Sequence, residues 1–178
     1  MVNKTRLIVL RGPSGSGKST VAKLVHGKAF NKTALISQDY YRHTMFNNLH
    51  SDLEAPRQVM FAGVRAALDN GYDVIIEGLM GMAKYKSYFD ELLTYHPQNN
   101  YFFYFDVTFE ETLGRHETRQ KNEGLSESKM RKLFLLSGPS KFPCEVIISE
   151  GLTADQSTTL IVDNCGLLHM RSPSQLKG

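Results

Sequence analysis

Short apolar runs alternate along the chain with longer stretches in which apolar residues recur at helical spacing. A short continuous apolar run is typical of a buried strand, whereas apolar residues three and four positions apart indicate a helix. The predicted strands are Arg6–Leu10, Thr33–Ser37, Asp73–Glu77, Asn100–Asp106 and Thr158–Val162. The predicted helices are Lys18–Ala29, Ala55–Asn70, Lys84–Tyr95, Phe109–Lys121 and Glu127–Leu136. This alternation predicts βαβ units and an α/β fold around a parallel sheet.

The length of 178 residues suits one domain with a full hydrophobic core. No repeat or linker divides the chain, so we expect a single domain over residues 1–165. The chain ends in the polar, proline-containing stretch MRSPSQLKG, and we expect a frayed tail over residues 166–178.

Composition narrows the functional classes. No apolar run approaches the roughly 18 residues that span a membrane, and the apolar segment at the N-terminus is too short for a secretory signal. Cys144 and Cys165 have no metal-like spacing and are expected to be free thiols in a reducing cytoplasm. The net charge of +3 is compatible with polyanionic substrates such as nucleotides, but it is too small to require nucleic acid.

The stretch GPSGSGKST follows the first predicted strand and precedes the first predicted helix. Its spacing fits G-x-x-x-x-G-K-[ST], the phosphate-binding loop. The glycines let backbone N–H groups approach an anion, and the helix directs its positive end toward the same place. Lys18 is expected to reach the β- and γ-phosphates, and the Ser19 hydroxyl to bind Mg²⁺. The predicted nucleotide-binding residues are Gly12, Pro13, Ser14, Gly15, Ser16, Gly17, Lys18, Ser19 and Thr20.

Polar residues follow the second and third predicted strands, at the edge of a parallel sheet where ligands bind. Asp39 can accept a proton from an acceptor hydroxyl or hold Mg²⁺ through water; the alternative is a helix N-cap. Arg42 suits a forked contact with phosphate or carboxylate, or is a solvated surface residue. Glu77 is a candidate for orienting the water shell of Mg²⁺, or else pairs with a helix terminus. Arg57 opens the second helix and is a further candidate for substrate binding.

The segment after the fourth predicted strand is rich in basic residues. Thr108 and Glu111 have the spacing of a capping box that starts a helix, and Arg115 and Arg119 share a face of that helix. A basic helical hairpin at this place, over about residues 109–137, would form a lid that excludes water and stabilises charge on a transferred phosphoryl group. The alternative is a solvated charged face.

Four stretches, GPSGSGKST, QDYYR, IIEG and RHETR, resemble those of small phosphate-loop kinases of AAA-domain type, namely the zeta-toxin and chloramphenicol-phosphotransferase group. Polynucleotide 5′-hydroxyl kinases share the pattern. The resemblance implies a three-layer P-loop NTPase fold with a five-stranded parallel sheet and a helical lid. It also implies that Asp39 is the general base, that Lys18 and Ser19 bind nucleotide and Mg²⁺, and that lid arginines stabilise the transferred phosphate.

Taken together, these residues predict a cytoplasmic kinase that uses ATP and Mg²⁺ and transfers the γ-phosphoryl group to a hydroxyl of a small molecule. Two alternatives stay open. One is a polynucleotide 5′-hydroxyl kinase, and the other is a nucleotide-binding regulatory protein with slow ATP hydrolysis. The sequence does not identify the acceptor, the oligomeric state, or ATP over GTP.

Overall fold

The computed structural model describes residues 5–29, 31–47, 54–118, 126–140, 142 and 144–167. The strands are β1 (Leu7–Arg11), β2 (Thr33–Ser37), β3 (Asp73–Gly78), β4 (Asn100–Asp106) and β5 (Glu145–Ser149). The helices are α1 (Lys18–Lys28), α2 (Glu54–Asp69), α3 (Met82–Tyr95), α4 (Phe109–Thr118), α5 (Glu127–Leu135) and α6 (Ala154–Cys165), and a π-helical turn, η1 (Tyr40–Met45), follows β2.

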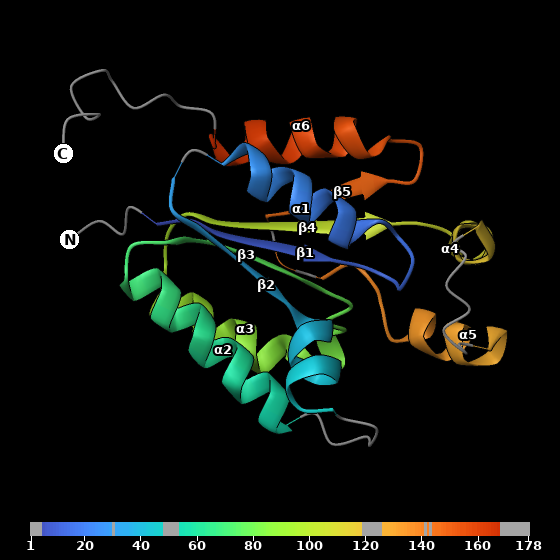
Figure 1. Ribbon diagram of the computed structural model, residues 1–178, viewed down its shortest axis with the longest axis horizontal. Coiled ribbons are helices and arrows are strands. Elements are labelled where there is room, and N and C mark those ends of the chain that lie inside the picture. The colour runs from blue at the N-terminus through green and yellow to red at the C-terminus, as the bar shows by residue number, and fades with distance from the viewer. Residues whose placement is uncertain are drawn as a thin grey trace.

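All five strands are parallel and lie in the order β2-β3-β1-β4-β5. Helices α1 and α6 cover one face of the sheet, and α2 and α3 cover the other (Figure 1). Helices α4 and α5 lie beyond the carboxyl ends of the strands, at one end of the molecule (Figure 1). The predicted three-layer α/β fold with a five-stranded parallel sheet is therefore confirmed.

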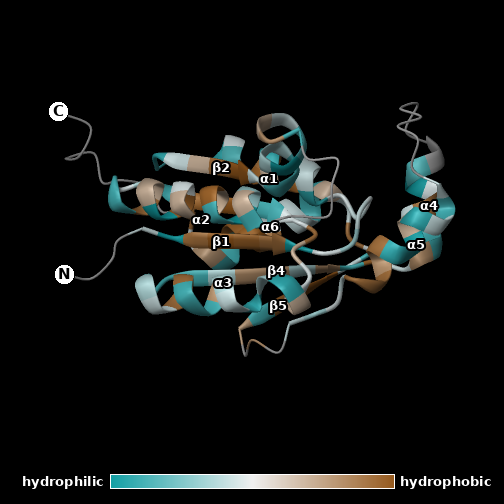
Figure 2. Cartoon of the chain, turned by 90° about the horizontal axis from the view of Figure 1, so that it is seen from below, coloured by the Kyte–Doolittle hydropathy of each residue, from teal (hydrophilic) through white to brown (hydrophobic). Residues whose placement is uncertain are grey.

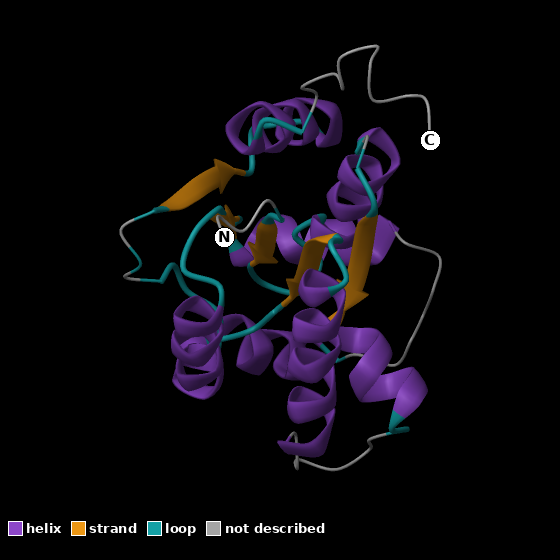
Figure 3. Ribbon diagram, turned by 90° about the vertical axis from the view of Figure 1, so that its left-hand side faces the viewer, coloured by secondary structure: helices purple, strands orange, loops and turns teal. Residues whose placement is uncertain are grey.

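The central strand β1 is buried on both faces, which explains why its sequence is continuously apolar rather than alternating. Leu7 and Val9 pack toward α2 and α3, whereas Ile8 and Leu10 pack toward α1 and α6. The strands accordingly carry hydrophobic residues in the interior (Figure 2), with helices on both sides of them (Figure 3). The two cores fix the sheet, and with it the carboxyl edge where the polar residues gather.

One predicted strand is wrong. Residues Thr158–Val162 belong to α6, and the fifth strand is the preceding run, Glu145–Ser149. The TTLIV run resembles a strand because it is β-branched, but Thr153 and Gln156 form a reciprocal capping box that starts a helix. Gly166, with a φ of 59°, ends it. The true β5 lies at the sheet edge and is only partly buried, so its hydrophobic signal is short.

The other predicted elements agree with the structure to within two residues at the ends that it describes, except that residues 119–125 lie outside the described part of the chain. Of the predicted tail, Gly166 closes α6 and Leu167 is buried; residues 168–178 lie outside the described part. Within the described residues, every helix is too short or too polar to cross a lipid bilayer.

Candidate functional site

The phosphate-loop motif lies between β1 and α1, in the strand–loop–helix order that it requires. Gly12, Gly15 and Gly17 have φ angles of 146°, 82° and 96°, which side chains rarely permit. A Cβ atom on Gly12 would lie 2.7 Å from the carbonyl oxygen of Phe105, so the first glycine is also required by a close approach to β4. This geometry turns the loop around the N-terminus of α1, where backbone N–H groups suit an anion.

The side chain of Lys18 lies across the loop. The residue is buried, and its Nζ donates to the carbonyl oxygen of Pro13 at 2.7 Å and to Oγ of Ser16 at 3.2 Å. Its ammonium group is thus held over the same backbone that would hold phosphate groups. The position agrees with the role predicted for this lysine, which stays a prediction.

Ser19 and Glu77 come from α1 and the carboxyl end of β3. The Ser19 hydroxyl donates to Oε2 of Glu77 at 2.9 Å, and Glu77 is buried. A hydroxyl and a carboxylate oxygen are hard ligands that suit Mg²⁺, which keeps several waters and shares the phosphates of its nucleotide. The described residues contain no group of three or more His, Cys, Asp or Glu side chains able to hold a metal ion. Because Ser19 lies in the first turn of α1, the alternative of a glutamate paired with a helix terminus describes this bond equally well, and the magnesium site stays a prediction.

Asp39 lies beyond the carboxyl end of β2 as the N-cap residue of η1, and Arg42 lies within η1. Asp39 occupies the N-cap position but makes no capping hydrogen bond with its side chain, so the capping alternative has no support. The residue is exposed. Because η1 continues from it, Arg42 follows three positions later, within η1.

Arg42 differs from the other arginines of the described residues. Each of the others pairs with a carboxylate, in the pairs Arg6–Asp73, Arg11–Glu145, Arg57–Glu54, Arg65–Glu91, Arg115–Glu111 and Arg131–Glu127. The Nε atom of Arg42 is buried without a hydrogen-bond partner, as are those of Arg57 and Arg65. Arg42 differs in that its guanidinium forms no ion pair with a described residue. An arginine left in this state next to a ligand-binding edge is suited to an external anion.

Gln38 and Tyr85, which sequence reasoning missed, form a hydrogen bond beside the end of β2. The Nε2 of Gln38 donates to the hydroxyl oxygen of Tyr85 at 2.6 Å, and both side chains are buried. Burial raises the pKa of Tyr85, while the hydrogen bond from Gln38 and the charges of Arg57 and Arg42 lower it. Gln38 adjoins Asp39 in sequence, but nothing in the pattern indicated that Tyr85, on α3, would meet it.

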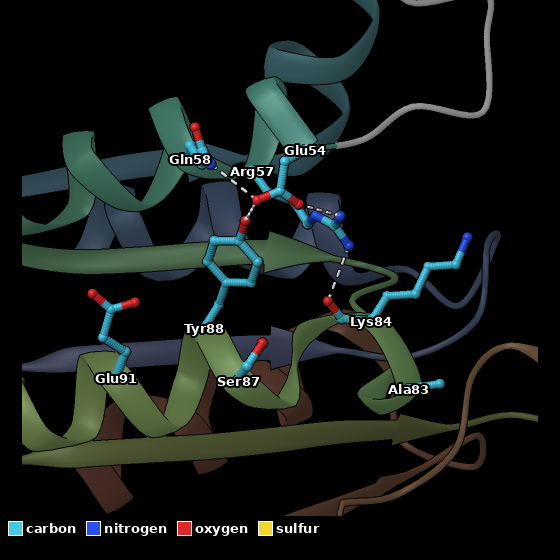
Figure 4. A pocket seen from close by; sticks show the side chains of 8 residues that line it. All are labelled: Glu54, Arg57, Gln58, Ala83, Lys84, Ser87, Tyr88 and Glu91. Atoms are coloured by element: carbon cyan, nitrogen blue, oxygen red, sulfur yellow. Dashed lines mark hydrogen bonds and ion pairs between the residues drawn. The ribbon is translucent and has the colours of Figure 1, made fainter.

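Arg57 lies on α2, beside a groove of about 700 Å³ between α2 and α3 (Figure 4). Its guanidinium donates to Oε2 of Glu54 at 2.8 Å and to the carbonyl oxygen of Lys84 at 3.0 Å. It also lies over the rings of Tyr85 and Tyr88, 5.6 and 5.4 Å from their centroids. The side chain is thus held by internal contacts, and its predicted role in substrate binding stays a prediction.

Helix α4 reaches the phosphate loop through Arg115. Its Nη1 donates to the carbonyl oxygen of Ser16 at 2.9 Å, and its Nε donates to Oε1 of Glu111 at 2.7 Å. Arg115 is therefore the predicted arginine that the structure brings to the site. Arg119 lies outside the described residues, as does Lys121.

The N-terminus of α4 is bonded to a residue that the sequence analysis did not anticipate, Glu150. Oγ1 of Thr108 accepts from the N–H of Glu111, as a capping box requires, but Glu111 pairs with Arg115 instead of reaching back. Glu150, after β5, takes its place and accepts from both the N–H and the hydroxyl of Thr108, at 2.8 and 2.9 Å. These hydrogen bonds lower the pKa of Glu150. Sequence reasoning missed Glu150 because it missed β5.

A hollow of about 250 Å³ lies beside the phosphate loop. Ser16 and Thr20 line it from the loop and α1, and Glu150 and Thr153 line it from the segment between β5 and α6. Arg115 forms part of its wall. It is large enough for the base or sugar of a nucleotide whose phosphates lie on the loop.

Comparisons with known proteins agree with this geometry. A family model described as an AAA domain, AAA_33, matches residues 7–134. A sugar kinase from Janibacter sp. HTCC2649 superposes with a TM-score of 0.69 and 20% identity, over 92% of this chain and 96% of that one. The APS kinase CysC of Mycobacterium tuberculosis, solved with AMPPNP and APS, superposes with a TM-score of 0.70 and 17% identity, over 89% and 96%. At these identities the likeness shows the fold.

A third structure, a chain of the Pnkp1/Rnl/Hen1 RNA repair complex, is 28% identical. The match has a TM-score of 0.60 and covers 74% of this chain but 43% of that one. No curated protein matches the sequence.

Proposed function

Since the chain belongs to the AAA_33 family of AAA domains, with the fold of P-loop kinases, we propose that it transfers the γ-phosphoryl group of ATP to a hydroxyl of a small, anionic acceptor. The observation that carries the proposal is the guanidinium of Arg42, which pairs with no described carboxylate and lies three positions beyond Asp39 at the carboxyl edge of the sheet. A carboxylate or phosphate on the acceptor would supply the anion that every other described arginine already has.

The nucleotide half of the reaction uses the phosphate loop. Its backbone N–H groups bind the phosphates, and Lys18, now bonded to the carbonyl of Pro13, turns its ammonium group to them. Ser19 and Glu77 would hold Mg²⁺, which when bound neutralises charge on the β- and γ-phosphates. The hollow lined by Glu150 and Thr153 receives the base or sugar.

The acceptor half uses the end of β2. Asp39 accepts the proton of the attacking hydroxyl, while Arg42 binds the anionic group and so fixes the direction of attack. Arg115, which donates to the carbonyl oxygen of Ser16 in the phosphate loop, places positive charge near the phosphoryl group that is transferred. The chain thus supplies position and charge, which is what phosphoryl transfer requires of a protein.

The proposal is tested with γ-labelled ATP, Mg²⁺ and a panel of four acceptor classes. These are hydroxy acids, phosphomonoesters with a free hydroxyl, neutral alcohols of matched size, and a 5′-hydroxyl oligonucleotide. We expect label in one of the first two classes. Arg42→Gln should raise the KM for that acceptor at least tenfold, whereas Arg65→Gln, which removes an arginine from an exposed ion pair between α2 and α3, should not.

Each other outcome contradicts the proposal in its own way. Label on the oligonucleotide alone would favour a polynucleotide kinase, an alternative that the match to the RNA repair complex supports. Label on neutral alcohols as readily as on acids would remove the role of Arg42. ATP binding without transfer to any hydroxyl would favour the regulatory alternative.

A further inference from the structure

Arg11 ends β1 and directly precedes the phosphate loop, yet its side chain is fully buried. Its Nε and Nη2 donate to Oε1 of Glu145, the first residue of β5, at 3.0 and 2.9 Å. The carboxylate of Glu145 is 2% exposed. A buried ion pair of this kind adds little net stability compared with apolar side chains, because desolvation opposes the attraction. Its other contacts therefore indicate what it does.

The remaining contacts tie β1 to the chain that returns from α5. Nη2 of Arg11 also donates to the carbonyl oxygen of Gly138 at 3.0 Å. The second carboxylate oxygen of Glu145 accepts from the N–H of Ser140. The guanidinium lies over the ring of Tyr104, 5.5 Å from its centroid. The segment between α5 and β5 is thus bonded at two places to a pair whose arginine adjoins Gly12.

A further chain of hydrogen bonds leads from Arg11 toward Asp39, the proposed base for the acceptor hydroxyl. Nη1 of Arg11 donates to the carbonyl oxygen of Met80 at 2.9 Å, and Met80 holds a φ of 38°, unusual for a residue with a side chain. The N–H of Met80 donates to Oε1 of Gln38 at 3.3 Å, and Gln38 bonds to Tyr85. Arg11 is therefore connected through Met80 to Gln38, the residue before Asp39.

We infer that Arg11 and Glu145 are positioning residues that hold α5, through the segment that follows it, and the Asp39 end of β2 in place relative to the phosphate loop. The inference rests on the proposed kinase function, because that function requires these three parts to meet. Arg11 contacts no substrate in this arrangement. Arg11 acts on one side directly through Gly138 and, by way of Glu145, through Ser140. On the other side it acts through Met80 and Gln38.

The chain offers a matched control at the opposite end of β1. The N–H and Nη1 of Arg6 donate to the two carboxylate oxygens of Asp73, at 2.8 and 3.0 Å. Asp73 is buried, as Glu145 is, but it lies at the amino edge of the sheet. Asp73→Asn thus removes a buried carboxylate of the same kind without touching the proposed site.

The experiment compares Arg11→Lys, Glu145→Gln and Asp73→Asn with the wild type, using AMP-PNP and Mg²⁺ as the probe. Lysine keeps the charge but cannot serve all the acceptors at once. The amide of Glu145→Gln replaces one carboxylate oxygen by a donor, so either the guanidinium or the N–H of Ser140 loses its acceptor. Calorimetry gives the affinity for the probe, and hydrogen exchange follows peptides covering residues 36–42 and 126–140. All three variants should melt at lower temperature than the wild type.

The expected results distinguish a positioning role of Arg11 and Glu145 from a general loss of stability. In the wild type the probe slows exchange in both peptides. In Arg11→Lys and Glu145→Gln the affinity should stay within about threefold, while the slowing falls by about tenfold or more in residues 126–140. In Arg11→Lys the probe should also no longer slow hydrogen exchange in residues 36–42. Asp73→Asn should keep the wild-type response in both.

Full slowing in the Arg11 and Glu145 variants would overturn the inference, as would an equal loss in Asp73→Asn. If Arg11→Lys does not fold, Glu145→Gln alone decides the outcome for residues 126–140. A wild type that does not bind the probe would refute the proposed function itself. A wild type that binds it, with variants that respond normally, would refute only the positioning role.

Discussion

Replacing Asp39 by asparagine separates an acceptor kinase from a protein that only binds nucleotide. Asparagine keeps the size of the side chain and its capacity to cap a helix. In the structure Asp39 is exposed and makes no capping hydrogen bond. We therefore expect the free energy of unfolding to change by no more than about 0.5 kcal/mol, the usual effect at such surface positions.

The catalytic consequence should be much larger. A positioned general base contributes roughly 10² to 10⁴ in rate, which corresponds to about 2.7 to 5.5 kcal/mol of transition-state stabilisation. Because a loose transition state requires less help from a base, the low end of that range is expected. The affinity for ATP and Mg²⁺ should stay near that of the wild type, since Lys18, Ser19 and the loop backbone carry those contacts.

Three measurements on one variant decide the matter: thermal unfolding, calorimetry with ATP and Mg²⁺, and transfer to the acceptor found in the panel. Lost transfer with intact binding supports Asp39 as the base. If affinity in the presence of Mg²⁺ falls together with the rate, Asp39 belongs to the metal shell instead. A variant that keeps both would remove Asp39 from the mechanism and refute the reasoning.

Three shorter predictions concern other parts of the molecule. Lys18→Ala should nearly abolish transfer while the fold survives, because it removes the cation held over the loop; a normal turnover number in a steady-state assay would contradict the site. Burial raises the pKa of Cys165 to about 12, so a thiol reagent at pH 8 should modify the exposed Cys144 rapidly and Cys165 only on unfolding, as mass spectrometry would show. The lowered pKa of Glu150 means that its bonds to Thr108 stabilise the fold above its ordinary pKa of 4.5, and that this contribution is lost as the pH falls through the lower folded value. Glu150→Gln should therefore lower the melting temperature at pH 7 and have little effect once the carboxyl is protonated, and an equal effect at both pH values would exclude this linkage.

The sequence determined those features whose signals are local. The GPSGSGKST loop follows from residue spacing, and its neighbours follow from the apolar run of β1 and the periodicity of α1. The pairing of Ser19 with Glu77 could be anticipated as well, because the carboxyl ends of parallel strands meet at one edge. The same argument placed Asp39 at this edge, and Arg42 follows it by three positions in η1.

Tertiary structure decided what depends on partners far apart in the chain. The TTLIV run has the composition of a strand, but the cap at Thr153 and the packing of α6 against α1 make it a helix. Glu150 reaches Thr108 across 42 positions, and Arg11 reaches Glu145 across 134. No local pattern encodes such contacts, because they form only when the sheet brings the ends of β1, β4 and β5 together. The lack of a carboxylate partner for Arg42 among the described residues also depends on tertiary structure. It becomes clear only when the ion pairs of all the other described arginines are known.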